Sequence, residues 1–261
     1  MTTPSQPKIR LSDVHKSFGP KVVLDGLDLE VAAGESVVLI GGSGTGKSVL
    51  LKHIIGLITP DRGTIEIDGV DLQSLALHEL TVFRRRFGMA FQEGALFDSM
   101  TVAGNVGFAL KRHTRLSRQE IADRVEECLA VVRLDGVGEK LPSQLSGGMR
   151  RRVGFARAIA LEPEILLFDE PTTGLDPVTT ALIDEVIIDI RERLSTTTVT
   201  ITHDMTSAFR IADRIGMLLD GRIIALAGPE EFRHLADPRV QQFINGRAAG
   251  PLSDLAVDSR G

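Results

Sequence analysis

The residues best suited to chemistry lie between Gly41 and Ser48, where the sequence reads GGSGTGKS. An apolar run at 36–40 precedes them and a helical pattern follows, which is the strand, glycine-rich turn and helix of a phosphate-binding loop. Glycines let several backbone N–H groups point at one anion, and the helix N-terminus adds the positive end of its dipole. In this setting Lys47 would reach the β- and γ-phosphates and Ser48 would ligate Mg²⁺. The alternative is a glycine-rich turn that merely joins a strand to a helix.

The predicted nucleotide-binding residues of this loop are Gly41, Gly42, Ser43, Gly44, Thr45, Gly46, Lys47, Ser48 and Val49.

Polar residues also follow three other apolar runs that are typical of buried parallel strands. With the strand each follows, they are Gln92 (87–91), Asp169 and Glu170 (165–168), and His203 (198–202). In an open parallel sheet, ligands bind at the carboxyl ends of the strands. Each residue alone is better explained by a turn or a helix cap. Their shared position beside the glycine-rich loop indicates one site.

Phosphoryl transfer to water defines the roles that these residues would take. It requires a metal that bridges the phosphates and a group that orients and deprotonates the water. Asp169 suits the Mg²⁺ shell, acting with Ser48 and water, and Glu170 is the candidate base. His203 would sense the γ-phosphate or hold the water. Gln92 would contact metal or water and couple the nucleotide to the helical segment that follows.

The remaining patterns predict the elements that position this site. Short antiparallel strands are expected at 8–14, 21–24, 27–31 and 64–67, and a hairpin at 215–219 and 222–226. Ser117 and Glu120 form a capping box for a helix whose buried stripe includes Cys128. We therefore expect an α/β P-loop NTPase fold with a mainly parallel core sheet, a flanking antiparallel β subdomain and a helical subdomain inserted at about 94–145. The domain would span 8–245, followed by a C-terminal tail at 246–261, of which 248–261 is expected to be mobile.

Composition narrows the possible partners and compartment. The formal charge is −5 at pH 7, so a nucleic acid is not an expected partner. No apolar run approaches the roughly 20 residues that span a bilayer, and the N-terminus has no signal-peptide core. The single cysteine fits a reducing compartment. We expect a cytoplasmic chain.

A second helix start is also suited to binding an anion. Leu145 to Met149 reads LSGGM, with Ser146 as a well-chosen N-cap and with Gly147 and Gly148 leaving the backbone accessible. Arginines follow at 150–152. The alternative is a flexible helix start whose arginines form a solvated face.

The order GGSGTGKS, Gln92, LSGGM, ILLFDE, GLD and His203 resembles the ATP-binding cassette (ABC) transporter ATPase family over residues 8–230. The resemblance implies ATP and Mg²⁺ as cofactors. It also implies a homodimer in which Ser146, Gly147 and Gly148 of one copy bind the γ-phosphate held by the loop of the other. Phe18 occupies the position that stacks on adenine, although a core role is the alternative. Permease subunits would be separate membrane proteins that dock near 92–110, where the apolar candidates are Leu96, Phe97, Met100, Val102 and Phe108. The alternative is that these residues fill the core of the helical subdomain, which is expected equally for Val102 and Phe108.

Two departures from the common family pattern are similar to one subgroup. Met149 replaces the usual Gln, and the segment after Gln92 lacks a proline. Both resemble the Mla type, which powers phospholipid transport between bacterial membranes, as do residues 237–243 and 250–251. The resemblance implies a peripheral protein on the inner face of the bacterial cytoplasmic membrane and points to further lipid-binding subunits as candidate partners. Alternatives are an ABC importer of another substrate such as amino acids, a non-transport ABC ATPase, and a nucleotide-binding scaffold without activity.

Overall fold

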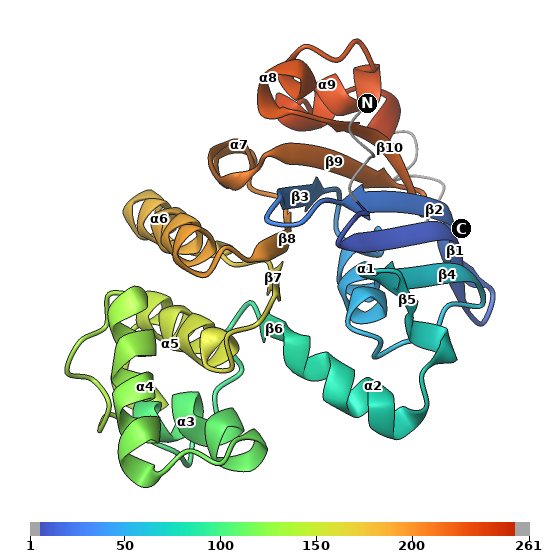
Figure 1. Cartoon of the computed structure of the whole chain (residues 1–261). Coiled ribbons are helices and arrows are strands. Elements are labelled where there is room, and N and C mark those ends of the chain that lie inside the picture. Colours follow the sequence, from blue (N-terminus) through green and yellow to red (C-terminus); the bar gives the residue numbers. More distant parts are fainter. Residues whose placement is uncertain (1–5, 254–261) are drawn as a thin grey trace, which may run out of the picture.

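The structure is a computed structural model that describes residues 6–253, and its centre is a six-stranded sheet (Figure 1). The strand order is β10-β9-β3-β8-β7-β6, and neighbours are parallel except for the β9–β10 hairpin. The strands are β3 (Ser36–Ile40), β6 (Phe87–Ala90), β7 (Ile165–Asp169), β8 (Thr197–Thr202), β9 (Arg214–Leu219) and β10 (Arg222–Ala227). The α/β fold and the predicted parallel strands are confirmed.

Strand β3 shows why the parallel strands are continuously apolar. Val38 and Ile40 belong to one hydrophobic cluster, with helices of the inserted region, while Val37 and Leu39 belong to a second cluster beside the smaller sheet. Successive side chains of a strand point to opposite faces, and here both faces are covered. The strand that leads into the glycine-rich loop is therefore anchored on both sides.

The smaller sheet is antiparallel, with the order β2-β1-β4-β5. Its strands are β1 (Ile9–Phe18), β2 (Lys21–Val31), β4 (Arg62–Ile67) and β5 (Val70–Asp71). The segments predicted separately at 21–24 and 27–31 form one strand. Its pairing with β1 shifts register at Gly26, where φ is 71°. A bulge keeps the chain in the sheet where the alternating pattern breaks.

The inserted region consists of α3 (Val102–His113) and α4 (Arg118–Val131), which pack on α5 (Gly147–Ile159) (Figure 1). The capping box at the start of α4 is confirmed, and Cys128 is 1% exposed in the core. Burial raises the pKa of this thiol to about 11, so it is not poised to react. Since α5 also packs on β6, the helical region continues past residue 145 and is joined to the core sheet.

The remaining helices are α1 (Lys47–Ile54), α2 (Leu77–Phe83), α6 (Pro177–Leu194), α7 (Met205–Ile211), α8 (Pro229–Arg233) and α9 (Pro238–Ile244), with 3₁₀ turns η1 (Leu72–Ser74), η2 (Arg84–Arg86) and η3 (Pro142–Gln144). Within residues 6–253, none of the helices combines the length and apolar character needed to cross a bilayer.

The start of the expected mobile tail is packed in this structure. Gln242 of α9 accepts a hydrogen bond from the Leu252 amide at 2.7 Å and donates one to the Ser253 hydroxyl at 3.0 Å. Leu252 packs against the main hydrophobic cluster. These two residues of the expected tail are therefore packed on α9 in the structure, the mobility of the tail stays a prediction, and residues 254–261 lie outside the described residues.

Candidate functional site

The loop between β3 and α1 encloses its own lysine. Lys47 Nζ donates hydrogen bonds to the carbonyl oxygens of Gly41 and Gly42, at 2.7 and 2.9 Å. Gly46 has a φ of 99°, and a Cβ there would lie 2.8 Å from a methyl carbon of Val23, so this position requires glycine. Gly46 is also the N-cap of α1 and offers no side-chain cap. The first-turn N–H groups of α1 are therefore left for a ligand.

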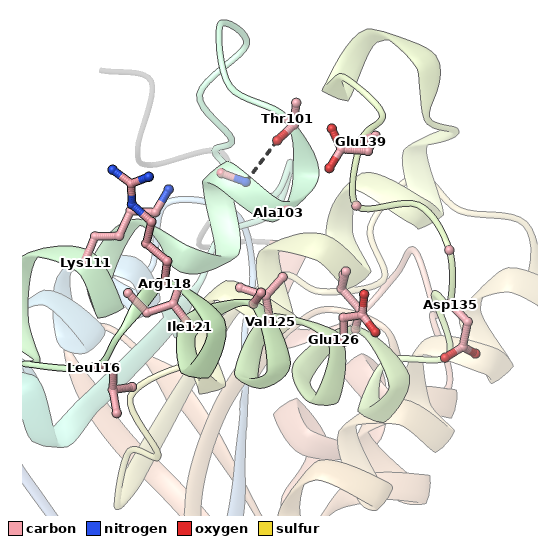
Figure 2. Close-up of a pocket in the computed structure, with 15 residues that line it drawn as sticks. Thr101, Ala103, Lys111, Leu116, Arg118, Ile121, Val125, Glu126, Asp135 and Glu139 are labelled. Carbon is pink, nitrogen blue, oxygen red and sulfur yellow. Dashed lines mark hydrogen bonds between the residues drawn. The ribbon is translucent and has the colours of Figure 1, made fainter.

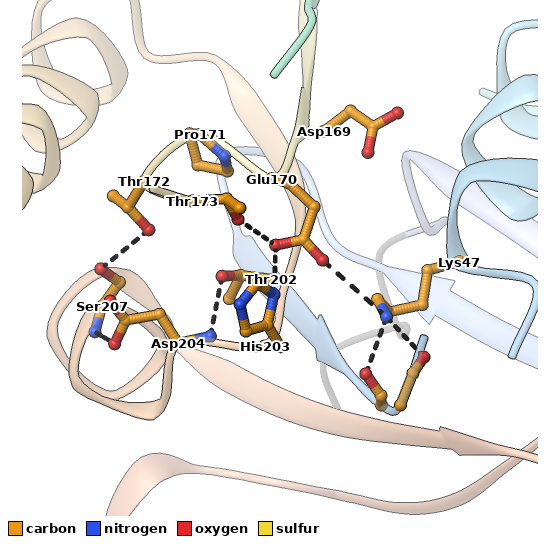
Figure 3. Close-up of polar contacts among 12 residues, drawn as sticks. Lys47, Asp169, Glu170, Pro171, Thr172, Thr173, Thr202, His203, Asp204 and Ser207 are labelled. Carbon is orange, nitrogen blue, oxygen red and sulfur yellow. Dashed lines mark hydrogen bonds and ion pairs between the residues drawn. The ribbon is translucent and has the colours of Figure 1, made fainter. Parts of the chain in front are cut away.

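Two carboxylates at the end of β7 face this loop. Ser48 Oγ donates to Asp169 Oδ1 at 3.2 Å. Lys47 Nζ lies 3.9 Å from Glu170 Oε1 (Figure 3). Burial lowers the pKa of Lys47, and burial likewise raises the pKa of Asp169. Each buried charge therefore lies beside an opposite charge or a hydrogen-bonding group. A hydroxyl and a carboxylate together supply hard oxygen ligands of the kind that Mg²⁺ takes.

Glu170 is held on both its backbone and its side chain. Its φ of 51° is in the left-handed region, and its amide donates to the Ile201 carbonyl at 2.9 Å. Its Oε2 accepts a hydrogen bond from Thr173 Oγ1 at 2.8 Å and lies 2.9 Å from His203 Nδ1 (Figure 3). Non-glycine residues adopt this backbone conformation at a cost of about 1–3 kcal/mol, which the surrounding contacts must offset. The carboxylate is thereby fixed between Lys47 and His203.

One cavity of about 820 Å³ unites these groups. The predicted residues that line it are Phe18, Gly42, Ser43, Gly44, Gly46, Lys47, Ser48, Val49, Gln92, Asp169, Glu170 and His203. Gly41 and Thr45 shape the loop, since the Gly41 carbonyl holds Lys47 and the Thr45 hydroxyl donates to the Gly42 carbonyl at 2.9 Å. The structure thus brings residues from four strand ends into one site.

Sequence reasoning missed four further lining residues: Lys21, Val23, Thr173 and Phe243. Phe243 belongs to α9, far along the chain from the loop. No local pattern marks it, because only the packing of α9 brings it to the cavity. Thr173 lies three residues after Glu170, and this spacing was a weak sequence signal that its hydroxyl could contact the carboxylate.

The second predicted anion site lies away from this cavity. At the start of α5, Ser146 Oγ accepts a hydrogen bond from the Met149 amide at 3.3 Å, and Ser146 and Gly147 are exposed. A Cβ added at Gly147 would meet no atom within 4 Å. The predicted N-cap is confirmed, but Gly148 is buried against Thr179 of α6, so the expectation of an accessible backbone holds for Gly147 and is wrong for Gly148. Within one chain, this helix end does not contact the phosphate loop.

The expected alternative, a solvated arginine face on α5, is wrong for Arg151, which is 8% exposed. Arg157 is also half-buried and donates to the carbonyls of Gly94 and Ala95 at 2.8 and 2.7 Å. These guanidinium groups bind loop carbonyls instead of water.

The arrangement fits binding and hydrolysis of a nucleoside triphosphate. Backbone N–H groups and Lys47 suit the phosphates, while Ser48 and Asp169 would hold Mg²⁺, which neutralises developing phosphate charge when bound. Glu170 is placed to accept a proton from an attacking water, with His203 hydrogen-bonded to it. Phe18, 48% exposed at the rim, offers an aromatic face to a base.

This chain is similar in sequence to a known protein family. The family model described as "ABC transporter" matches residues 24–173. The probable ribonucleotide transport ATP-binding protein mkl of Mycobacterium tuberculosis is 44% identical over 95% of this chain and 69% of the relative. The intermembrane phospholipid transport system ATP-binding protein MlaF of Escherichia coli is 38% identical over 94% of this chain and 91% of MlaF.

Solved structures agree with these sequence relatives. A dimeric ATP-binding cassette in a post-hydrolysis state, bound to ADP and Pi, aligns with a TM-score of 0.77 at 34% identity. The alignment covers 85% of this chain and 98% of that cassette.

Proposed function

This chain belongs to the ABC transporter family and is an ABC-type ATPase, and we propose that two copies close around two ATP–Mg²⁺ to drive phospholipid transport between bacterial membranes. The dimer is supported by the observation that the two anion sites, the loop at Gly41–Ser48 and the start of α5, lie apart within one chain. The loop at Gly41–Ser48 lines one cavity together with Asp169, Glu170 and His203, whereas Ser146 and Gly147 are exposed and do not line that cavity. A second copy supplies the missing half of each site, and a solved relative of this fold is itself a dimer.

A substitution of the proposed base tests the dimer. Glu170→Gln keeps the shape of the side chain but cannot accept a proton, so we expect ATP binding without turnover. The variant should accumulate as an ATP-bound dimer, measured by gel filtration with light scattering and by nucleotide content. A monomeric variant that still hydrolyses ATP would contradict both the base role and the dimer.

We also propose that separate integral-membrane subunits dock on the inserted helical region near residues 92–110. Phe97 and Phe108 are 43% and 37% exposed, and their rings pack with centroids 4.9 Å apart. Val102 is fully buried, so of the two roles expected for it the core role holds. Leu96 is half-buried and packs against the main cluster. The aromatic pair is therefore the apolar contact on this surface.

A neighbouring groove of about 850 Å³ between α3, α4 and the loop at 135–139 extends this surface (Figure 2). Ile121 and Val125 lie on its apolar wall. Lys111 and Arg118 lie together toward one end, whereas Glu126 and Asp135 lie toward the other. A helix dipole is negative at its C-terminus and positive at its N-terminus. These charges favour a short amphipathic helix of the membrane subunit, its C-terminus beside the two basic residues.

Co-purification with the membrane subunits tests the docking surface. Phe97→Asp with Phe108→Asp should release the chain from detergent-solubilised membranes, because charges would be buried at the interface. Basal ATPase activity of the isolated chain should persist. The control is Leu77→Asp with Val82→Asp on α2, which alters two apolar residues elsewhere that are more exposed, at 76% and 56%. Equal retention of both variants would place the docking surface elsewhere.

The phospholipid cargo is supported by MlaF, which this chain matches across nearly all of its length. The subgroup-like segments after Gln92 and at 237–243 support the same cargo. The name of mkl favours a second candidate, a ribonucleotide. On either reading the chain acts at the inner face of the cytoplasmic membrane, and for phospholipid further lipid-binding subunits would complete the assembly.

Analysis of what co-purifies with the complex separates these cargoes. Bound glycerophospholipid, and ATPase stimulation by added phospholipid but not by ribonucleotides, is the expected result. Stimulation by ribonucleotides alone would favour the second candidate. Stimulation by amino acids alone would favour an importer of that class.

A further inference from the structure

Arg151 is a buried cation whose hydrogen bonds go to backbone carbonyls. Its Nε donates to the Gln92 carbonyl at 2.6 Å and its Nη1 to the Pro171 carbonyl at 3.3 Å, while its Nη2 donates to the Thr173 carbonyl. Among residues 6–253 it has no carboxylate at ion-pair distance. The carbonyl dipoles are therefore what compensates the buried charge.

The three carbonyls belong to two loops that border the nucleotide cavity. Gln92 follows β6, and Pro171 and Thr173 follow the β7 strand end that carries Glu170. The planar guanidinium fork presents several donors at fixed angles, so one side chain can hold two loops. A lysine ammonium has no such fork.

Thr173 links Arg151 to the proposed base. The Thr173 carbonyl accepts from Arg151, and the Thr173 hydroxyl donates to Glu170 Oε2 at 2.8 Å. Figure 3 shows Thr173 between the loop backbone and the Glu170 carboxylate. One residue therefore separates the guanidinium from the carboxylate that is placed to accept the proton.

We infer that Arg151 is a positioning residue for ATP hydrolysis, which fixes Gln92 and Glu170 relative to the helix that begins at Ser146. This inference rests on the role proposed above for Glu170. Arg151 lies five residues after Ser146 on α5, a rise of about 7.5 Å. An anion held at the start of α5 by a second copy is thus rigidly connected to the loops that carry the base and Gln92.

Arg152 provides a matched control on the same helix. Its Nη1 donates to the carbonyls of Val132 and Arg133, at 3.2 and 2.8 Å. It is the same residue type, also partly buried, and also bound to backbone carbonyls. Its contacts lie at the end of α4, away from the nucleotide cavity.

The first experiment compares steady-state ATP hydrolysis by full-length R151Q, R151K and R152Q. We expect R151Q to lower kcat by about 100-fold, as misplacement of a catalytic group by about 1 Å does, with KM for ATP unchanged. R151K should lower kcat nearly as much as R151Q does, because an ammonium cannot bridge both loops. R152Q should keep kcat near the wild-type value even where its melting temperature falls.

A double-mutant cycle with T173V distinguishes positioning from a general loss of stability. If Arg151 acts through Thr173, the kcat loss in R151Q/T173V will be smaller than the product of the two single losses. Multiplicative losses, or a wild-type kcat in R151Q, would overturn the inference. If R151Q does not fold, the same cycle is run with R151K.

E170Q, measured beside these variants, separates this inference from the proposed function. An active E170Q would contradict the base role itself. An inactive E170Q with multiplicative losses in the cycle would contradict only the link through Arg151.

Discussion

The starts of α1 and α5 use the same backbone device in opposite ways. Helix α1 follows a glycine-rich turn, and α5 begins with two glycines in its own first turn; in each, a glycine leaves first-turn N–H groups accessible. At α1, Gly46 provides no side-chain cap, and the lysine is buried beside two carboxylates. At α5, Ser146 caps the helix itself and Gly147 is exposed. The start of α1, which lines the cavity beside two carboxylates, is suited to bind and hydrolyse a phosphate, whereas the exposed start of α5 is suited to the proposed role of completing a site on a second copy.

The two helix starts also differ in how far their surroundings exclude water. Around α1, Lys47 and Asp169 are both partly desolvated, as the lowered lysine pKa and the raised aspartate pKa indicate. At α5, the Ser146 and Gly147 backbone is in contact with solvent. Fields are stronger where water is excluded. The reaction is therefore expected at the first helix, with the second contributing binding energy.

The largest effect should come from a substitution at the start of α1. Lys47→Ala removes the buried cation that would contact the β- and γ-phosphates, so turnover should fall by on the order of 1,000-fold and ATP binding should weaken. Isothermal titration and ATPase assays measure both. Lys52→Ala, on an exposed lysine of the same helix, is the control and should be unaffected. Normal turnover in the Lys47 variant would disprove the phosphate-loop assignment.

A negative charge introduced at the start of α5 should reduce ATP hydrolysis without unfolding the protein. Gly147→Asp places a charge where a γ-phosphate of a second copy would lie, so we expect hydrolysis to fall by about 100-fold. The new side chain has free space, and an acidic residue in the first turn stabilises a helix. Binding of ATP to the monomer should be unchanged by titration.

Gly147→Asn is the neutral control and should lose much less activity, because it adds similar bulk without charge. If the two variants lose activity equally, space rather than phosphate binding limits this position. If both keep full activity, α5 does not complete the site.

A smaller effect is expected from the two phenylalanines that line the nucleotide cavity. Phe18→Ala and Phe243→Ala should each raise KM for ATP by about tenfold, since stacking on an aromatic ring contributes about 1–3 kcal/mol per base. Steady-state kinetics measure KM, and kcat should be retained. Phe108→Ala, outside the cavity, is the control. An unchanged KM in the Phe243 variant would restrict base recognition to Phe18.

The smallest effect concerns pH. The raised pKa of Asp169 means that its carboxylate is protonated at a higher pH than an ordinary aspartate as the solution is acidified. Mg²⁺ dependence of hydrolysis should therefore weaken several-fold on the acid side, while the same change would leave anion binding at α5 unaffected. Asp169→Asn should show weak Mg²⁺ dependence at every pH. An Mg²⁺ titration at several pH values tests this, and equal midpoints in the native chain would contradict it.

Local order along the chain was enough to predict the loop, the strand-end residues and the helix caps. The glycine at 46, the lysine at 47 and the capping box at Ser117 act on backbone groups a few residues away, so their spacing alone specifies their geometry. The same holds for Asp169 and Glu170, because a buried strand must deliver the next residues to its carboxyl edge.

Contacts between distant segments were decided only by tertiary packing. Phe243 enters the cavity because α9 packs beside it, and Val102 is core rather than surface. Arg151 belongs to a polar-looking run, yet it is buried against two loops. A sequence pattern reports period and local hydrogen bonding, but which face is covered depends on elements brought together by burial of apolar surface. The sequence therefore determined which groups are candidates to bind the phosphate, and the tertiary structure decided which contacts hold them in place.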